Sequence, residues 1–301
     1  VNEAYRVWHG LPHMDDALQA PLNIQHFDNY RMGASTETRF KPLERIPGLA
    51  VGGWFDAGDF DFEAPAHAST IQSLVDTWEA FKPLRDQTLV DQAHRFVDIH
   101  RPDGKPDLLQ QIEHGVLQVA AHYRAYGRLA RGMTDSVLYR YHHLGDASTQ
   151  TDNLLYDPSL KPYQVEGNRS GTPDDRWVFT IRMPSNNYAG IGALSAASRA
   201  LKGFNDRLAD ECLAMAKKAY AEERKMAADN PPAGMDARFG PGAEMAALFQ
   251  LIKATGKQQY IDRFAELLWP SLEQPGGRSL LLAVRALPYL GPGAAEKLRP
   301  F

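Results

Sequence analysis

Residues 106–127 read PDLLQQIEHGVLQVAAHYRAYG, and the spacing of their apolar side chains decides the fold class. The apolar residues recur every three or four positions, as on one face of an α-helix, at Leu108, Leu109, Ile112, Val116, Val119 and Tyr123. Pro106 suits the start of a helix, and Gly127 suits its end. The stretch therefore predicts one amphipathic helix.

The same helical period extends to both sides of this stretch. It recurs in HASTIQSLVDTWEAF (67–81), NYAGIGALSAASRAL (187–201), LADECLAMAKKAY (208–220), GAEMAALFQLIKATG (242–256) and QQYIDRFAELL (258–268). Connections such as 202–206 and 254–258 are short, which favours antiparallel neighbours. Strand patterns are scarce, and VFTI (178–181) is the best one. We therefore expect an all-α fold of roughly eight helices stacked as hairpins.

Composition excludes several classes of function. The chain has 301 residues and a net charge of −4, so it carries no basic footprint for nucleic acid, and we expect no such partner. Cys212 is the single cysteine, which excludes an intrachain disulfide. No apolar run is long enough to span a bilayer.

Two stretches interrupt the helical pattern, residues 1–55 and residues 132–183. A long irregular passage inside a compact domain usually binds substrate or is disordered, and the aromatic residues here favour an ordered, substrate-side loop. We expect one domain over residues 1–301. The chain starts at Val1 and stops abruptly at Phe301, so we also expect it to be a fragment of a longer protein.

The candidate catalytic residues are concentrated in the segment VGGWFDAGDFD (51–61). Asp56 and Asp59 are three residues apart, so one tight turn would bring both carboxylates to the same side. Gly52, Gly53 and Gly58 permit unusual backbone angles and the close approach of a ligand. Two adjacent carboxylates repel each other unless one takes up a proton or both hold a water or a cation. A general base that acts on water needs such a pair.

Other readings of this segment remain open. An Asp/Gly cluster is often only a turn. A calcium loop is a second alternative, since acidic residues alternate at Asp59, Asp61 and Glu63, but the invariant glycine of an EF-hand would fall at Ala64. A phosphate-binding loop is disfavoured because the segment is acidic and lacks the glycine-rich motifs.

The sequence GGWFDAGDFDF (52–62) resembles the GGW-[YFH]-DAGD signature of glycoside hydrolase family 9, the family of many inverting cellulases. Four further segments are similar to family segments in the same order, namely 9–21, 103–118, 186–220 and 242–264. The resemblance is good over residues 45–268 and loose at the ends. It implies an (α/α)6 toroid of helical hairpins, incomplete in this chain, with long loops on the substrate side.

The resemblance also implies roles for the residues of the turn. Asp59 would be the general base that deprotonates the attacking water, Asp56 would hold the same water, and Trp54 would shape the turn. In an inverting glycosidase the base and the acid lie about 6.5–9.5 Å apart to leave room for the water. Asp56 and Asp59 therefore cannot serve as each other's partner, and a separate carboxylic acid must protonate the leaving oxygen.

In the family that acid is a glutamate near the C-terminal end of the toroid, and no segment of residues 1–301 matches its motif. Internal candidates exist, namely Glu63, Glu113, Glu166 and Glu244. Glu113 and Glu244 lie in helical patterns and are expected to be solvated or structural. No acid is assigned within the chain, and we expect it beyond Phe301.

Aromatic and polar loop residues are candidates for sugar binding, because rings stack on sugar faces and polar groups bind hydroxyls. Trp177 is the best platform, followed by Tyr188 and Trp54, although Trp177 fits a core position equally well. His143, with Asp146 and Asp152, lies in a loop that the resemblance places beside substrate. Ordinary loop hydrogen bonding is the alternative for His143.

Three hypotheses of function follow. The first is inverting hydrolysis of a β-linked glucan such as β-1,4-glucan or xyloglucan. The second is a non-catalytic glycan-binding homologue that lacks the acid. The third is a polysaccharide lyase on another α/α toroid, which the acidic chain without an evident arginine cluster disfavours. We expect a secreted, periplasmic or cell-surface protein without a cofactor. The resemblance allows bound Ca²⁺, but no metal site is assigned.

Overall fold

The computed structural model describes residues 17–21, 37–55, 62–91, 93–94, 96–134, 151–229, 234–274 and 279–301. The chain divides into two compact units. The strand unit comprises Val1–Ala64 and Ala130–Arg182, and the helical unit comprises Pro65–Leu129 and Met183–Phe301. The expectation of a single domain over residues 1–301 stays a prediction.

The helices form where the apolar period predicts them, and all six predicted helices are confirmed. Those present among the described residues are α1 (Ala64–Phe81), α2 (Asp107–Tyr126), α3 (Pro184–Ala200), α4 (Asp206–Asp229), α5 (Gly234–Thr255), α6 (Gln258–Leu272), α7 (Leu280–Ala286) and α8 (Ala294–Leu298). Pro106 precedes α2, and Gly127 ends it with a left-handed φ of 73°, as predicted. A two-stranded hairpin, β3 (Leu89–Asp91) and β4 (Phe96–Asp98), also lies in the helical unit.

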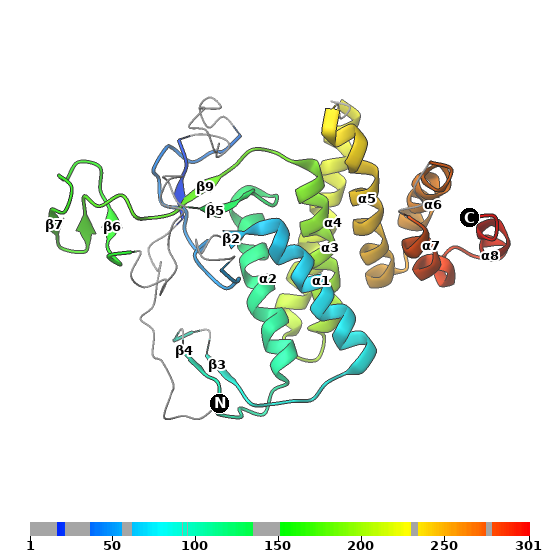
Figure 1. Cartoon of the computed structure of the whole chain (residues 1–301), viewed down its shortest axis with the longest axis horizontal. Coiled ribbons are helices and arrows are strands. Elements are labelled where there is room, and N and C mark those ends of the chain that lie inside the picture. The colour runs from blue at the N-terminus through cyan, green and yellow to red at the C-terminus, as the bar shows by residue number, and fades with distance from the viewer. Residues whose placement is uncertain are drawn as a thin grey trace. The chain divides into compact units, whose positions relative to one another are not determined.

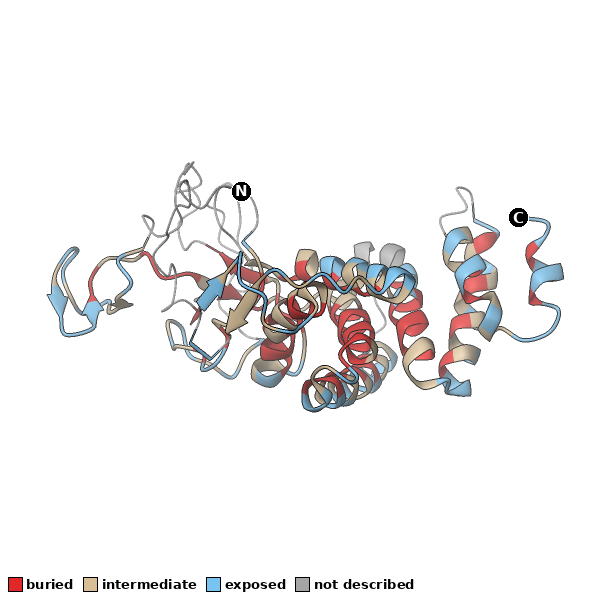
Figure 2. Cartoon of the chain, turned by 90° about the horizontal axis from the view of Figure 1, so that it is seen from below, coloured by how far each residue is buried: buried red, intermediate tan, exposed pale blue. Residues whose placement is uncertain are grey.

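Helix α3 is the centre of the helical unit. It contacts α2, α4 and α5, and Figure 1 shows it among these helices. Most of its residues are small and buried, and the buried positions run along several helices of the unit (Figure 2). At Gly190 an added Cβ would lie 2.5 Å from Tyr123 Oη, so glycine permits the close approach of α3 to α2.

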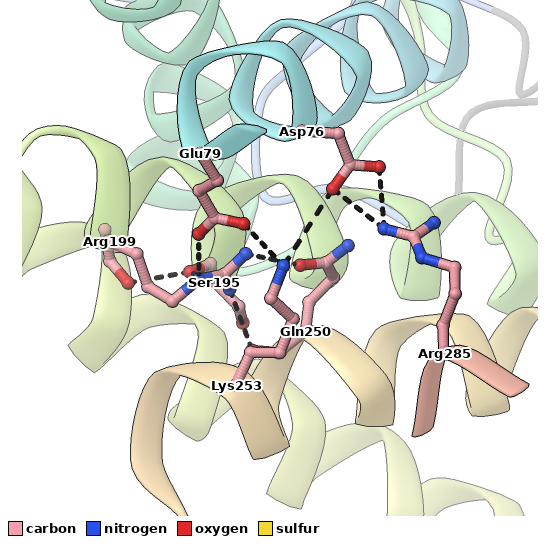
Figure 3. A network of polar contacts seen from close by, with 8 residues as sticks. Asp76, Glu79, Ser195, Arg199, Gln250, Lys253 and Arg285 are labelled. Atoms are coloured by element: carbon pink, nitrogen blue, oxygen red, sulfur yellow. Dashed lines mark hydrogen bonds and ion pairs between the residues drawn. The ribbon is translucent and has the colours of Figure 1, made fainter. Parts of the chain in front are cut away.

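An ion network ties four helices of this unit together (Figure 3). Glu79 of α1 accepts hydrogen bonds from Arg199 Nε of α3 at 2.7 Å and from Lys253 Nζ of α5 at 2.5 Å. Asp76 of α1 pairs with Arg285 of α7 at 2.8 Å. The network joins residues up to 209 positions apart in the sequence.

The described residues of the strand unit form two small sheets, whose strands are drawn in Figure 1. The first has the order β1-β9-β5-β2, formed by Leu18–Gln19, Trp177–Phe179, Gly132–Thr134 and Phe62–Glu63. Strand β1 runs parallel to β9, and the other two pairs are antiparallel. The second sheet has the order β6-β8-β7, formed by Leu155–Tyr156, Arg169–Ser170 and Val165–Glu166.

The strand predicted at 178–181 is therefore present as β9, whereas the all-α class holds only for the helical part of the fold. The other strands have two or three residues, too few for an alternating pattern to show in the sequence. In the described parts of the chain no helix combines the length and the hydropathy needed to cross a membrane.

Candidate active site

The turn that precedes the acidic segment has the backbone that its glycines suggest. Gly52 has φ 60° and Gly53 has φ 77°, both in the left-handed region that side chains disfavour. Trp54 follows directly and is half-buried. The prediction of unusual angles is confirmed for Gly52 and Gly53, whereas Gly58 lies outside the described residues.

The two aspartates with predicted catalytic roles, Asp56 and Asp59, lie outside the described residues. Their roles as water holder and general base therefore stay predictions. The residues on either side of the segment are described. Phe55 and Phe62 stack with ring centroids 5.0 Å apart and an interplanar angle of 17°. The two described residues that flank positions 56–61, Phe55 and Phe62, are therefore in contact with each other.

A buried cation lies against this aromatic pair. The guanidinium carbon of Arg176 is 5.1 Å from the centroid of the Phe55 ring and 6.0 Å from that of Phe62. Arg176 is 2% exposed. The backbone carbonyl oxygen of Arg176 accepts hydrogen bonds from the N–H groups of Ala17 at 3.2 Å and Leu18 at 3.1 Å. These bonds hold the backbone of Arg176 beside β1.

Arg176 is not among the residues that the sequence predicts for the site. Its signal is weak, since one arginine in the loop sequence DDRW looks like a solvated residue. Arg176 directly precedes β9, and Phe62 lies on β2 of the same four-stranded sheet, so the pairing of distant strands brings the two residues into one sheet.

Trp177 is half-buried at the start of β9, where it pairs with Leu18 and Thr134. Its ring centroid lies 6.4 Å from that of Phe179, on the same side of the strand. Partial exposure is compatible with a sugar platform as well as with a place at the edge of the core. The platform role of Trp177 stays a prediction.

The polar loop residues fall into two groups. His143 and Asp146 lie outside the described residues. Asp152 is described, and its carboxylate accepts hydrogen bonds from the Ser170 hydroxyl at 2.5 Å and the Leu154 N–H at 2.8 Å. These contacts give Asp152 a role in holding its own loop.

Tyr188 belongs to the helical unit, where it is 4% exposed on α3. Its ring centroid lies 6.3 Å from that of Tyr220 on α4. Burial first, and then the nearby charges of Glu244 and Glu223, raise the pKa of its hydroxyl well above the usual value. A residue this deeply buried offers little surface to a ligand. Its burial therefore does not support the predicted role of Tyr188 as a sugar platform.

Two of the candidate acids have structural contacts, as expected from their helical patterns. Glu244 is 5% exposed and pairs with Arg263 at 3.0 Å and Arg224 at 3.4 Å. Glu113 accepts a hydrogen bond from Asn205 Nδ2 at 2.6 Å. Glu244 is thus buried and paired rather than solvated.

The other two candidate acids lie in the strand unit. Glu63 on β2 forms an ion pair with Arg131. Glu166 on β7 is exposed and accepts a hydrogen bond from Gln164 Nε2 at 2.8 Å. Neither contact marks a proton donor, and no acid is assigned. Among the described residues no group of three His, Cys, Asp or Glu side chains is placed to hold a metal ion.

A family profile described as Glycosyl hydrolase family 9 matches residues 8–273. The chain belongs to this family. The match includes the GGWFDAGDFDF turn and all of the helices α1 to α6. No curated protein sequence matches the chain at a significant level.

Solved structures of family 9 share the fold. The GH family 9 endoglucanase J30 matches with a TM-score of 0.59 and 17% identity, over 97% of this chain and 50% of that one. A family 9 protein of Bacteroides ovatus matches with a TM-score of 0.56 and 16% identity, over 96% and 49%. A metagenome-derived family 9 endoglucanase matches with a TM-score of 0.53 and 21% identity, over 96% and 44%.

The chain thus spans about half the length of the family 9 structures that it matches. At these identities the likeness concerns the fold alone. The mostly helical architecture agrees with the family, while closure of an (α/α)6 toroid stays a prediction.

Proposed function

We propose that this chain takes part in inverting hydrolysis of a β-linked glucan, with Asp59 as the general base. One observation carries the proposal: the family match spans the GGWFDAGDFDF turn. The left-handed backbone at Gly52 and Gly53 supports it, because a turn of this kind can direct the following carboxylates to one side.

In the proposed reaction Asp59 removes a proton from water as the oxygen attacks the anomeric carbon, and Asp56 orients that water. The leaving oxygen takes a proton from a separate carboxylic acid on the other side of the sugar. Both steps occur together through an oxocarbenium-like transition state, and the anomeric configuration inverts. The acid is not assigned to any residue of this chain.

The proposed substrate class is β-1,4-glucan, xyloglucan or a related plant polysaccharide. Two of the similar structures are described as endoglucanases, which supports a glucan. Trp54 and Trp177 are half-buried rather than fully buried, and we propose both as platforms for sugar rings. Because such polymers lie outside cells, we also propose that the protein acts in the periplasm, at the cell surface or after secretion.

The test compares Asp59→Ala with the unchanged residue in the whole protein from which the sequence derives. We expect release of reducing ends from β-glucan to fall by about 10²–10⁴-fold, the usual contribution of a general base. Asp157→Asn is the matched control, since Asp157 is a strand-unit aspartate whose carboxylate pairs with Arg169 at 3.0 Å. Normal turnover by Asp59→Ala would show that the base is misassigned.

The alternative is a glycan-binding homologue without catalysis, motivated by the absence of a matching acid motif in residues 1–301. It predicts binding of β-glucan oligosaccharides without product. Any release of reducing ends that depends on Asp59 would exclude it.

A further inference from the structure

Residues 154–171, all of them described, form a small arm around the second sheet, of which Figure 1 labels β6 and β7. Only Ser170 and Gly171 are buried in this arm, so apolar packing contributes little to it. Hydrogen bonds hold it instead. The Asp157 N–H donates to the Ser170 carbonyl oxygen at 2.8 Å, and the Asp157 carboxylate accepts from Arg169 Nη1 at 3.0 Å. Polar contacts thus give the arm a defined backbone.

A turn in the arm, residues 161–164, carries an aromatic side chain on a left-handed backbone. The Gln164 N–H donates to the Lys161 carbonyl oxygen at 2.9 Å, which closes a four-residue turn. Pro162 requires a negative φ at the second position, and Tyr163 has φ 63° at the third, as in a type II turn. This third position favours glycine. The chain therefore places a tyrosine where glycine would fit with less strain.

The backbone under Tyr163 is held on both sides. The Gly171 N–H donates to the Gln164 carbonyl oxygen at 2.9 Å, and a side chain at position 171 would collide with the Lys161 carbonyl group. The Gln164 side chain accepts the Lys161 N–H at 3.2 Å and donates to Glu166 Oε1 at 2.8 Å. A ring on so well fixed a backbone loses little freedom when a ligand covers it.

The ring itself is open to solvent. Tyr163 is 86% exposed, the largest exposed fraction of any large hydrophobic side chain in the described parts of the chain. The exposed side chains of Lys161, Glu166 and Arg169 belong to the same arm and offer hydrogen-bond donors and acceptors. A single exposed aromatic residue is ordinary. Its place on a strained backbone that the arm holds fixed is what points to a ligand.

The size of the apolar surface decides between classes of ligand. Tyr163 and Val165 are the exposed large hydrophobic residues of the arm. An aromatic side chain buries about 150–250 Å² when it is covered, whereas a stable protein interface needs about 800 Å² from each partner. The arm is thus too small a surface for a folded protein. It matches one pyranose ring, since β-linked glucose presents C–H groups on its faces and hydroxyl groups at its rim.

We propose that Tyr163 is the stacking platform of an accessory site on the arm, which binds one glucosyl unit of a β-glucan chain. The inference rests on the substrate class of the proposed function, and it adds a binding residue that the sequence did not single out. A polymer held at a second place dissociates less readily, because release from one place leaves it attached at the other.

The experiment reads the ring directly. The whole protein from which the sequence derives, with Asp59→Ala to prevent turnover, is labelled with 3-fluorotyrosine and observed by ¹⁹F NMR. The Tyr163 signal is assigned by its absence from Tyr163→Gly. Glycine suits the left-handed position, so this variant keeps the turn. We expect cellohexaose to shift the Tyr163 signal in a saturable way and the α-linked maltohexaose to leave it in place.

Affinity electrophoresis in soluble xyloglucan measures the contribution of the ring. Tyr163→Gly should weaken binding by about three- to ten-fold, the usual effect of one stacked aromatic ring. Tyr163→Phe should bind normally, because it keeps the ring. Phe81→Ala is the matched control, since Phe81 is a similarly exposed ring, 79% exposed at the end of α1, and its loss should leave binding unchanged.

Four results would overturn the inference. The first is a Tyr163 signal that does not move at millimolar cellohexaose. The second is an equal shift with maltohexaose. The third is a shift on raising the protein concentration without sugar, which would indicate contact between two copies. The fourth is equally weak binding by Tyr163→Phe and Tyr163→Gly. If Tyr163→Gly does not fold, Tyr163→Asn takes its place, because asparagine also tolerates a left-handed backbone.

Release of reducing ends from β-glucan, with Asp59 intact, separates the two proposals. If cellohexaose shifts the Tyr163 signal but no glucan is hydrolysed, the proposed hydrolysis fails and the accessory site stands. If glucan is hydrolysed and the Tyr163 signal does not move, the proposed hydrolysis stands and the accessory site fails.

Discussion

At the scale of single residues, His122 shows how strongly burial can control charge. It is fully buried on α2, and its Nε2 atom lies 2.8 Å from Gln118 Nε2. Burial first, and then the positive charges of His67 and Arg128, lower the pKa of the imidazole to about 3. His122 is therefore neutral in the fold over most of the accessible pH range.

This neutrality predicts a loss of stability in acid. Between pH 6.5, the ordinary pKa of histidine, and about pH 3, the unfolded chain binds a proton at His122 and the folded chain does not. The free energy of unfolding should thus fall by roughly 1 kcal/mol per pH unit from this group as the pH drops through that window. Urea titrations at several pH values should show a shallower dependence in His122→Gln, and identical slopes would contradict the prediction.

At the scale of elements, the contact of α3 with α2 depends on a missing side chain. Gly190 lies against Tyr123, whose hydroxyl donates to Asn187 Oδ1 at 2.8 Å. Asn187 Nδ2 in turn donates to the buried Glu223 at 2.8 Å. A methyl group at position 190 would clash with the Tyr123 hydroxyl, which is the first member of this series of hydrogen bonds.

We expect Gly190→Ala to lower the free energy of unfolding by about 1–3 kcal/mol, because its Cβ would meet Tyr123 Oη at 2.5 Å. Gly242→Ala is the matched control. Gly242 is an exposed glycine in α5 with nothing within 4 Å of an added Cβ, and alanine there should be neutral or stabilising by up to about 1 kcal/mol. Chemical denaturation measures both, and equal effects would show that the helix contact is not tight.

At the scale of the molecule, the helical unit is assembled from two stretches of chain, Pro65–Leu129 and Met183–Phe301. The ion network of Figure 3 joins them through Glu79, Arg199 and Lys253. Burial alone would raise the pKa of Glu79, but hydrogen bonds from the two cations outweigh it and hold this pKa below its usual range. Its stabilising effect is therefore present above pH 4.5 and is lost as the pH falls below that value.

Glu79→Gln should destabilise the helical unit by about 1–3 kcal/mol near neutral pH, since it leaves two partly buried cations without their carboxylate. Arg285→Met breaks the more exposed Asp76 pair, whose side chains are 40% and 37% exposed, and should cost less than about 1 kcal/mol. Urea denaturation followed by circular dichroism compares the two. The reverse order would show that burial does not set the value of these contacts.

The sequence alone determined the helices of this protein. Their apolar period is local, so it is visible at residues 106–127 without knowledge of any neighbour. It also determined the family, because GGWFDAGDFDF is a contiguous motif, and it marked Gly52 and Gly53 as positions of unusual backbone. Asp56 and Asp59 were identified in the same way, and their roles stay predictions.

Only the tertiary structure decided which distant residues meet. The strands of two or three residues form by pairing across the chain, as Leu18 does with Trp177, and so leave no local pattern. The burial of Tyr188 against Tyr220 and the approach of Arg176 to Phe55 and Phe62 likewise depend on segments far apart in the sequence. Local spacing predicts helices and turns, whereas burial and electrostatic partners are properties of the packed chain.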